Sequence, residues 1–264
     1  MYAFDYTRPA SVADAVATLA NDSDAKVLAG GMTLIPTLKQ RLAQPSQLVD
    51  LGALSSLSGI RRDGDTLVIG AMTRHADVAS SDIVAAALPA LAALADGIGD
   101  AQVRHRGTIG GSIVNHDPAA DYPSAVLGLG AMVVTDRREI AADDFFTGLF
   151  ATALEEGEIV TEIRFPLPKR AAYVKFPNPA SRYAVVGVFV AETGSGVRVA
   201  VTGAGPGVFR AGNFETALAG SFTAAALDGA TWPADDLNSD IHASAAYRAH
   251  LIGVLAKRAV AAIA

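Results

Sequence analysis

The sequence predicts an α+β protein, in which a part with alternating strands and helices is followed by a part with strands first and helices afterwards. Between residues 11 and 165, short segments of strand character alternate with segments of helical periodicity. Pro166-Leu167-Pro168 then interrupts the chain, and proline both ends strands and stiffens linkers. Beyond it three strand-like segments precede three helical ones, which is typical of an α+β domain. We therefore expect one domain over residues 1–168 and a second over residues 171–264.

The composition excludes several classes of protein. With 264 residues, a net charge of −6 and 51% apolar residues, the chain is expected to be a globular protein with a large core. Its mild acidity argues against a nucleic-acid surface, which calls for a basic patch. Cysteine is absent, which excludes disulfides, thiolate catalysis and iron–sulfur or zinc sites held by cysteine. The apolar runs are far too short to span a membrane and no secretory signal is seen, so we expect a cytoplasmic location.

The first elements follow from capping and turn signals. Ser11 opens a segment with capping-box spacing, so a helix is expected to begin there. Residues 26–29 are expected to form a short buried strand that runs directly into Gly30-Gly31. Thr33 is expected to cap the next helix. The inner stripe expected for that helix comprises Leu34, Leu38 and Leu42.

The rest of the first domain is expected to combine hairpins with short helices. Asp63-Gly64 predicts a hairpin turn, with Leu67 and Ile69 of the returning strand pointing inward. Pro89 is expected to restart a helix. Asp143-Asp144 is most simply a helix cap. The other expected elements are strands at 47–51, 131–135 and 158–165, helices at 83–94 and 124–129, and a hairpin turn at 136–138.

The second domain is expected to open with three antiparallel strands and to close with helices. Gly203–Gly207 looks like a nucleotide-binding fingerprint only superficially, because no helix start follows Pro206, and a loop that closes a hairpin fits better. Ser244 can cap the last helix. Its expected inward positions are Tyr247, Leu251, Val254 and Leu255. The expected strands are 172–176, 183–191 and 197–202, and the expected helices lie near 213–219, 223–228 and 243–263.

The strongest functional signal is Gly107–Ser112, which we call the second glycine segment. Consecutive free N–H groups in such a loop form a nest for an anion, usually a phosphate. Asn115, Asp117 and Asp121 follow it, and carboxylates suit hydroxyl groups rather than phosphate. Together they predict a site for a phosphorylated, polyhydroxylated cofactor. His116 is expected to serve as a local hydrogen-bonding residue.

Ala29–Leu34, the first glycine segment, predicts a further anion site. A strand, a glycine pair and a helix N-terminus follow one another there, which combines free N–H groups with the helix dipole. The simpler interpretation of each glycine pair is a tight turn. Neither segment matches a Walker A loop, since no lysine follows Gly111, and neither has the dinucleotide fingerprint.

No catalytic centre is expected in this chain. His105 and His116 flank the second glycine segment, but without cysteine and with scattered histidines we expect no metal site. Arg104-His105-Arg106 either complements phosphate charge or forms a solvated strand face. No Ser-His-Asp arrangement can be argued from the spacing.

At its two glycine segments the sequence resembles the FAD-binding medium subunits of the molybdenum hydroxylases, the family of carbon monoxide, xanthine and nicotine dehydrogenases. In that family the first segment has the form A-G-G-x-S/T-L, as in Ala29–Leu34. The second has T-I-G-G-S/N followed by D-P-x-x-D, as in Thr108–Ser112 and Asp117–Asp121. The likeness continues through Lys175-Phe176 and Ala243–Arg248, so it covers nearly the whole chain. Met32 departs from the histidine that is frequent in the carbon monoxide dehydrogenase type.

The resemblance implies a vanillyl-alcohol-oxidase-type FAD fold, with subdomains at about 1–52 and 53–168, followed by a small C-terminal α+β domain. It implies that residues of both glycine segments cradle the pyrophosphate, that Asp121 holds hydroxyls, and that Tyr183 lies near the isoalloxazine ring. The candidate cofactor-binding residues are Val27, Leu28, Ala29, Gly30, Gly31, Met32, Thr33, Leu34, Ile98, Thr108, Ile109, Gly110, Gly111, Ser112, Asn115, Asp117, Asp121, Val160, Lys175 and Tyr183.

The family likeness also implies a role in electron transfer. FAD would be bound without a covalent link and would pass electrons from [2Fe-2S] clusters to an external acceptor. The clusters and the molybdopterin cofactor would reside on a small and a large partner subunit, in a dimer of heterotrimers. The absence of cysteine fits this arrangement. The alternatives are a self-contained FAD oxidase of a small alcohol-like substrate and a flavin-less scaffold subunit.

Overall fold

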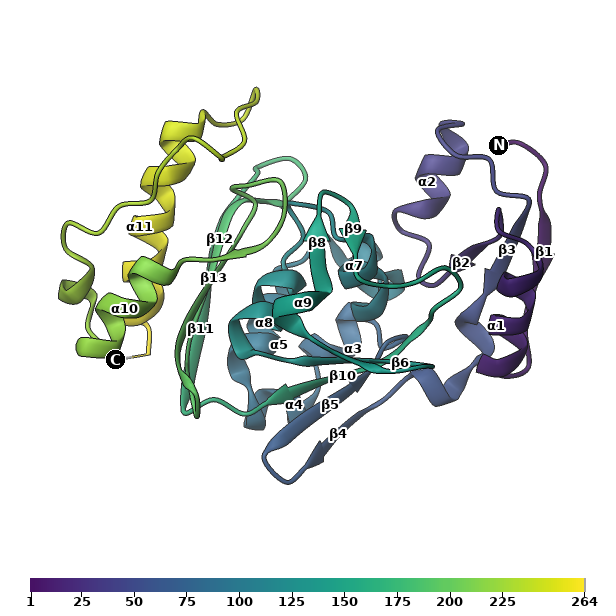
Figure 1. Ribbon diagram of the computed structural model, residues 1–264, viewed down its shortest axis with the longest axis horizontal. Coiled ribbons are helices and arrows are strands. Elements are labelled where there is room, and N and C mark those ends of the chain that lie inside the picture. Colours follow the sequence, from purple (N-terminus) through teal and green to yellow (C-terminus); the bar gives the residue numbers. More distant parts are fainter. Residues whose placement is uncertain (264) are drawn as a thin grey trace.

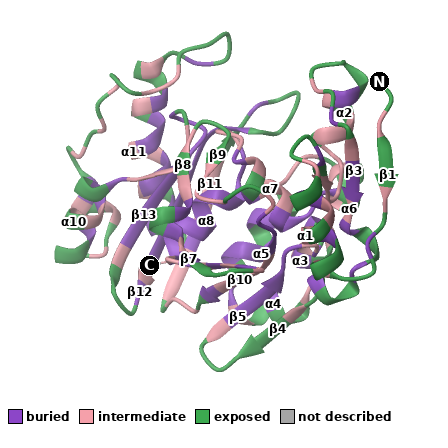
Figure 2. Cartoon of the chain, turned by 45° about the vertical axis from the view of Figure 1, so that its right-hand side comes forward, coloured by how far each residue is buried: buried purple, intermediate pink, exposed green. Residues whose placement is uncertain are grey.

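The computed structural model describes residues 1–263 and has three parts along its long axis (Figure 1). Ala264, the last residue of the expected second domain, lies outside the described residues. An N-terminal lobe lies at one end, a central part with most of the short helices follows, and a sheet covered by a long helix closes the other end. Each part has its own hydrophobic cluster, as the buried segments in Figure 2 indicate.

The N-terminal lobe contains a small parallel sheet with strand order β1-β3-β2. Ser11 caps α1 by accepting the N–H of Asp14, as predicted. The predicted strand at 26–29 exists, but it is not buried, because it is the edge of the sheet and borders a cleft. The elements of this lobe are β1 (Asp5–Thr7), α1 (Val12–Asn21), β2 (Lys26–Leu28), α2 (Leu34–Lys39) and β3 (Gln47–Asp50), followed by the 3-10 turns Leu51–Ala53 and Ser55–Leu57.

The central part is built on a five-stranded antiparallel sheet with strand order β4-β5-β10-β6-β7. Leu67 and Ile69 of β5 are fully buried beneath the helices, as predicted. The strands of the sheet are β4 (Ile60–Asp63), β5 (Thr66–Gly70), β6 (Met132–Thr135), β7 (Glu139–Ala141) and β10 (Val160–Pro166). The other elements are α3 (His75–Ala79), α4 (Asp82–Ala87), α5 (Pro89–Asp96), α6 (Ala101–Arg106), α7 (Ile109–Asn115), α8 (Tyr122–Leu129), α9 (Ala142–Phe145), β8 (Phe146–Gly148) and β9 (Ala151–Thr152).

The C-terminal part is an antiparallel sheet with strand order β11-β12-β13-β14, packed between α11 and α8. Phe189 and Ala200 of this sheet belong to the core of the central part, so the two cores meet there. The strands β11 (Arg170–Pro177), β12 (Ala184–Thr193), β13 (Gly196–Thr202) and β14 (Phe209–Arg210) precede α10 (Gly212–Gly220), the 3-10 helix Ala224–Leu227 and α11 (Ala245–Ala261). The predicted α+β class is confirmed. No helix within residues 1–263 is both long and apolar enough to cross a membrane.

Several local predictions are wrong, each for a packing reason. Leu42 is 74% exposed because α2 ends at Lys39 and Arg41 turns the chain with a φ of +60°. Thr33 occupies the N-cap position of α2, but its side chain makes no capping hydrogen bond. Asp143 lies inside the first turn of α9 and pairs with arginines instead of capping the helix. Tyr247 is 43% exposed, and the inward face of α11 is instead formed by Arg248, Leu251, Ile252, Leu255, Ala256 and Ala259.

Candidate functional site

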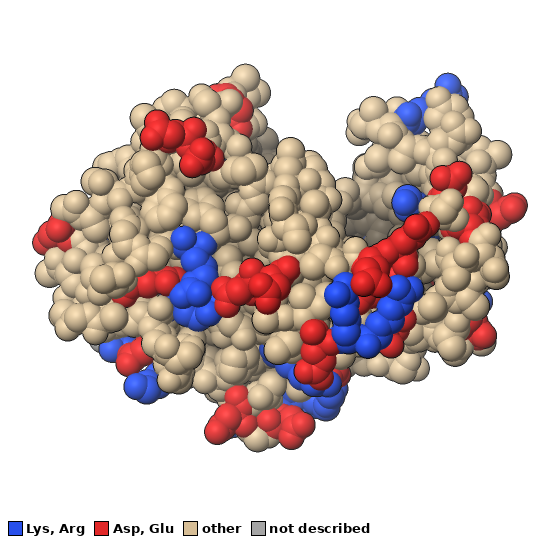
Figure 3. Space-filling model, viewed as in Figure 1, with Lys and Arg blue, Asp and Glu red and all other residues tan. Residues whose placement is uncertain are grey.

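A cleft of about 810 Å³ separates the N-terminal lobe from the central part. The space-filling view shows the molecule hollowed between these parts (Figure 3). Both glycine segments line the cleft, and residues 150–160 and 181–183 complete its walls. Its size falls in the range of sites for cofactors and other small molecules. Within residues 1–263, no group of three or more potential metal ligands comes together.

The first glycine segment, Ala29–Leu34, offers free backbone donors to the cleft. Gly31 has a φ of +75°, a conformation that favours glycine. A Cβ atom on Gly30 would collide with the main-chain carbonyl of Arg106, so glycine lets the lobe lie against the end of α6. In the described part of the chain, the N–H groups of residues 30–34 have no hydrogen-bond acceptor. Consecutive donors of this kind bind anions.

The second glycine segment is not the expected loop with free N–H groups, because it forms the first turn of α7. The N–H groups of residues 109–112 all have acceptors within the chain. Gly110 donates to the carbonyl of Ala71 at 2.8 Å, and the hydroxyl of Thr108 caps the helix by accepting the N–H of Gly111 at 3.1 Å. This segment therefore contributes side-chain hydroxyls and the helix dipole rather than a nest.

Glycine is needed in α7 because neighbouring atoms approach closely. A Cβ on Gly110 would lie 2.6 Å from the carbonyl oxygen of Ala71, so a side chain would push α7 away from the end of β5. A Cβ on Gly111 would lie 2.9 Å from Thr108 Oγ1 and 3.6 Å from the Cβ of Ala29. Gly111 thus keeps the gap between the two glycine segments open.

A buried polar cluster lies at the floor of the cleft, where Asp121 is 4% exposed. The hydroxyl of Tyr173 donates to Asp121 Oδ1, and the Lys175 ammonium lies 3.0 Å from the same atom. Burial raises the pKa of Asp121, and Lys175 opposes that effect. Burial, together with Asp117 and Asp121, also raises the pKa of Tyr183, which therefore stays a neutral donor on the cleft wall.

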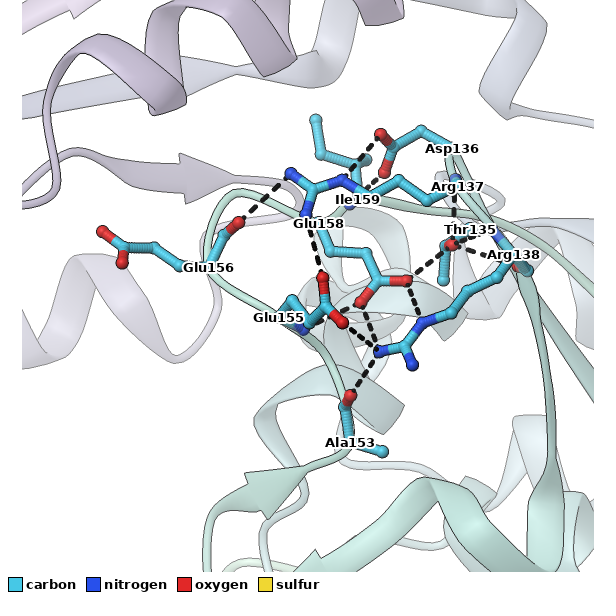
Figure 4. A network of polar contacts seen from close by, with 9 residues as sticks. All are labelled: Thr135, Asp136, Arg137, Arg138, Ala153, Glu155, Glu156, Glu158 and Ile159. Atoms are coloured by element: carbon cyan, nitrogen blue, oxygen red, sulfur yellow. Dashed lines mark hydrogen bonds and ion pairs between the residues drawn. The ribbon is translucent and has the colours of Figure 1, made fainter.

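A network of ion pairs holds the cleft wall formed by residues 155–159 (Figure 4). The buried carboxylate of Glu158 accepts from Arg138 Nε at 3.0 Å and Nη2 at 2.9 Å, and from the hydroxyl of Thr135 at 2.8 Å. It also accepts the N–H of Glu155. The Arg138 guanidinium, followed by the Glu155 N–H and the Thr135 hydroxyl, lowers the pKa of Glu158 to about 2, although burial works in the opposite direction. The wall is therefore held by a carboxylate that stays charged at neutral pH.

His75 is a cleft residue that the sequence did not reveal. It lies at the start of α3 and is 5% exposed, and its backbone N–H donates to the carbonyl of Gly107 at 3.0 Å. Burial, with a smaller effect of Arg104, lowers its pKa to about 4. Its Nδ1 atom and the hydroxyl of Tyr122 are buried without a partner in the described structure, and the two rings lie 5.2 Å apart. His75 is therefore a neutral imidazole packed behind the second glycine segment.

Most of the candidate residues meet in this one cleft. Leu28, Ile109 and Lys175 do not line it: Ile109 is fully buried in the core, and Lys175 pairs with Asp121. His116 hydrogen-bonds through Nδ1 to the carbonyl of Ala151 and accepts the N–H of Val208 at Nε2, so it is a hydrogen-bonding residue, but its partners are distant in the sequence rather than local. Cleft residues that the sequence analysis missed include Asp22, Lys26, His75, Phe150, Glu155, Glu156 and Ile159.

Comparison with known proteins identifies the family. Residues 2–168 match the family described as FAD binding domain in molybdopterin dehydrogenase, and residues 171–263 match the CO dehydrogenase flavoprotein C-terminal domain. The chain belongs to the FAD-binding medium subunits of the molybdenum hydroxylases. This medium subunit is accordingly part of an oxidoreductase. FAD is its cofactor, and the molybdenum and iron–sulfur cofactors of the family sit on other subunits.

The relatives are similar over nearly the whole length of this medium subunit. It is 40% identical to the carbon monoxide dehydrogenase medium chain of Hydrogenophaga pseudoflava, covering 97% of this chain and 96% of the relative. It is 38% identical to the nicotine 6-hydroxylase medium subunit of Paenarthrobacter nicotinovorans, covering 98% and 96%. Among solved structures, carbon monoxide dehydrogenase from H. pseudoflava superimposes with a TM-score of 0.90 at 40% identity, covering 99% and 97%. Quinoline 2-oxidoreductase from Pseudomonas putida 86 gives 0.89 at 30% identity, covering 99% and 96%.

Proposed function

We propose that this medium subunit holds FAD non-covalently in the cleft between its lobes and passes electrons from the [2Fe-2S] clusters of a partner to an external acceptor. The observation that carries the proposal is the run of N–H groups at residues 30–34, which have no acceptor within the described chain and line the cleft. Such donors suit a pyrophosphate without requiring a lysine. When bound, FAD supplies the redox chemistry, and the protein supplies position and electrostatics.

The residues of the cleft fit FAD in chemistry as well as in size. We assign the pyrophosphate to the first glycine segment, with the dipole of α7 and the hydroxyl of Ser112 facing it from the other lobe. Asp117 and Asp121 lie on the same wall and suit hydroxyl groups of the ribityl chain. Tyr183 and Ile98 also line the cleft, and we propose that they contact the isoalloxazine ring.

We further propose the arrangement of domains and subunits. Residues 1–168 would be the FAD-binding domain, with subdomains at about 1–52 and 53–168, and residues 171–264 the C-terminal domain. The three hydrophobic clusters support this division, with Phe189 and Ala200 of the C-terminal sheet packed into the central cluster. A small [2Fe-2S] subunit and a large molybdopterin subunit would complete a heterotrimer, which we propose to be doubled by symmetry. Relatives named as medium chains and medium subunits support a multi-subunit assembly. The cytoplasmic location stays a prediction.

The test is a titration of the full chain with FAD, followed by the visible absorption spectrum and by equilibrium dialysis. We expect flavin bands shifted from those of free FAD, and loss of binding in Gly111→Val, whose side chain would fill the gap toward Ala29. Gly220→Val is the matched control, because a Cβ there meets nothing within 4 Å. If neither the chain nor its assembled complex holds flavin, the flavin-less scaffold replaces this proposal. Turnover of an alcohol by the chain alone would favour the self-contained oxidase.

A further inference from the structure

We propose that a second pocket of this medium subunit, which we call the aromatic pocket, binds a small organic cation, namely a quaternary or protonated amine with apolar substituents. The pocket has a volume of about 400 Å³ and is lined mainly by residues 146–148, 206–210 and 232–237. Its lining side chains come from the cores of both the central and the C-terminal part. No residue lines both this pocket and the FAD cleft, so the proposal does not depend on the proposed function.

Hydrogen bonds tie the segments around the aromatic pocket together, so the pocket is formed before a ligand arrives. Nδ1 of the buried His116 bonds to the carbonyl of Ala151 on the β8–β9 hairpin at 2.9 Å, and Nε2 accepts the N–H of Val208 at 3.3 Å. Asn238 Nδ2 donates to the carbonyl of Gly205 at 2.7 Å, which joins the segment after Trp232 to the loop before Val208. Ligand pockets are usually formed in advance in this way.

The walls of the aromatic pocket suit a cation. Phe146 reaches the pocket from the central core, and Phe209 and Trp232 reach it from the C-terminal core. The rings of Phe209 and Trp232 stack with their centroids 5.0 Å apart, and all three side chains are half-buried, so part of their ring surface stays free. The face of an aromatic ring carries partial negative charge and attracts cations, and tryptophan does so most strongly.

The uncompensated charge at the aromatic pocket is negative. Asp236 is exposed, and within the described part of the chain its carboxylate has neither a hydrogen-bond donor nor an ion-pair partner. Arg210 also lines the pocket, but its guanidinium lies 2.6 Å from Glu215 and 3.4 Å from Asp143. Residues 211–247 contain acidic residues but neither lysine nor arginine. A cation in the pocket would therefore be attracted by Asp236, whereas an anion would be repelled.

Size and chemistry together define the class of ligand. A metal ion needs several oxygen or nitrogen ligands, but Asp236 is the only carboxylate on the pocket wall, and the described residues hold no cluster of potential metal ligands. The volume lies at the lower end of the range for small-molecule sites. Because most of the wall is apolar, the charge of the ligand must carry alkyl or aromatic substituents. These properties describe an organic ammonium ion.

Fluorescence of the full chain tests the proposal, because Trp232 is its only tryptophan and reports directly on the pocket. The chain is titrated with choline and, separately, with 3,3-dimethylbutan-1-ol, which has the shape of choline without its charge. Sodium chloride keeps the ionic strength constant. We expect a saturable change with choline and about tenfold weaker binding of the neutral alcohol, because the aromatic faces and Asp236 attract only the charge. Absence of a saturable change, or equal affinities for the two probes, would overturn the proposal.

Two substitutions locate the site. Asp236→Asn should weaken choline binding about threefold to fivefold, which is the range for one exposed charge pair. Asp235→Asn is the matched control, because the neighbouring carboxylate is exposed but does not line the pocket, and this variant should bind choline as wild type does. Equal losses in both variants would indicate general attraction to an acidic surface and would overturn the site. Tighter binding of Nα-acetylarginine amide than of choline would indicate a side chain of a partner protein and would overturn the assignment to a small free ligand.

Discussion

Replacing Glu158 by glutamine should destabilise the protein in a defined pH range. The fall of the Glu158 pKa from 4.5 to about 2 corresponds to about 3 kcal/mol at neutral pH. Arg138 is 42% exposed, and solvent screening reduces the expected value to about 1–2 kcal/mol. Because the pKa is lower in the folded than in the unfolded state, this contribution is complete above pH 4.5 and is lost as the pH falls toward 2. Glu158→Gln should therefore differ from wild type at neutral pH and match it near pH 2.

The assay is urea denaturation followed by far-ultraviolet circular dichroism, at neutral pH and at several values down to about pH 2. Glu156→Gln is the control, because the carboxylate of Glu156 points away from the network in Figure 4. Since the network holds a cleft wall, FAD affinity should also fall in Glu158→Gln. If Glu158→Gln and wild type lose stability in parallel between pH 4.5 and 3, the ion pair does not hold this wall and the reasoning is refuted.

Three further predictions follow from the cleft. Gly110→Ala should lower stability by about 1–3 kcal/mol, because its Cβ meets the backbone of Ala71. Gly111→Ala should lower the Tm less, because its Cβ meets only the capping hydroxyl of Thr108, and it should weaken FAD binding; equal Tm losses would contradict this. Wild type should lose about 3 kcal/mol of unfolding free energy as the pH falls from 6.5 to about 4, because over this range the imidazole of His75 is protonated in the unfolded but not in the folded state. His75→Gln should lack this loss, which chemical denaturation across the same pH range would measure. Thr108→Ala should cost about 1 kcal/mol through its lost cap, and Thr33→Ala almost nothing, as thermal melts of both variants would show.

Local signals in the sequence predicted those elements whose cause is itself local. Ser11 and Ser244 cap α1 and α11 because a hydroxyl oxygen at the N-cap accepts the N–H of the residue three positions later, whatever surrounds it. Pro89 begins α5 and Asp63 ends β4 for similar reasons. The motif residues also met in one cleft. The first glycine segment follows β2, and the second opens α7, which is hydrogen-bonded to Ala71 and Thr73 just after β5.

The sequence could not reveal features that depend on tertiary packing. Gly110 and Gly111 have low helix propensity, so a loop was the natural expectation, yet contact with Ala71 makes glycine the residue that lets α7 form there. The partners of Lys175 on Gly97, Asp121 and Arg182 could not be predicted either, because no local pattern shows where a lysine on a strand finds its acceptors. The charge network around Glu158 joins residues 135–138 to residues 153–159, and only the pairing of β6 with β10 brings these segments together.

The position of Asp121 has a consequence for how the protein is made. Its hydroxyl and ammonium partners both come from β11, which leaves the ribosome some fifty residues after it. Chains fold from the N-terminus during synthesis, so the two lobes can assemble while this carboxylate is still without its cation. The cleft is then complete only when the sheet of the last third has docked. We therefore expect the chain to take up FAD only after the C-terminal part has been translated.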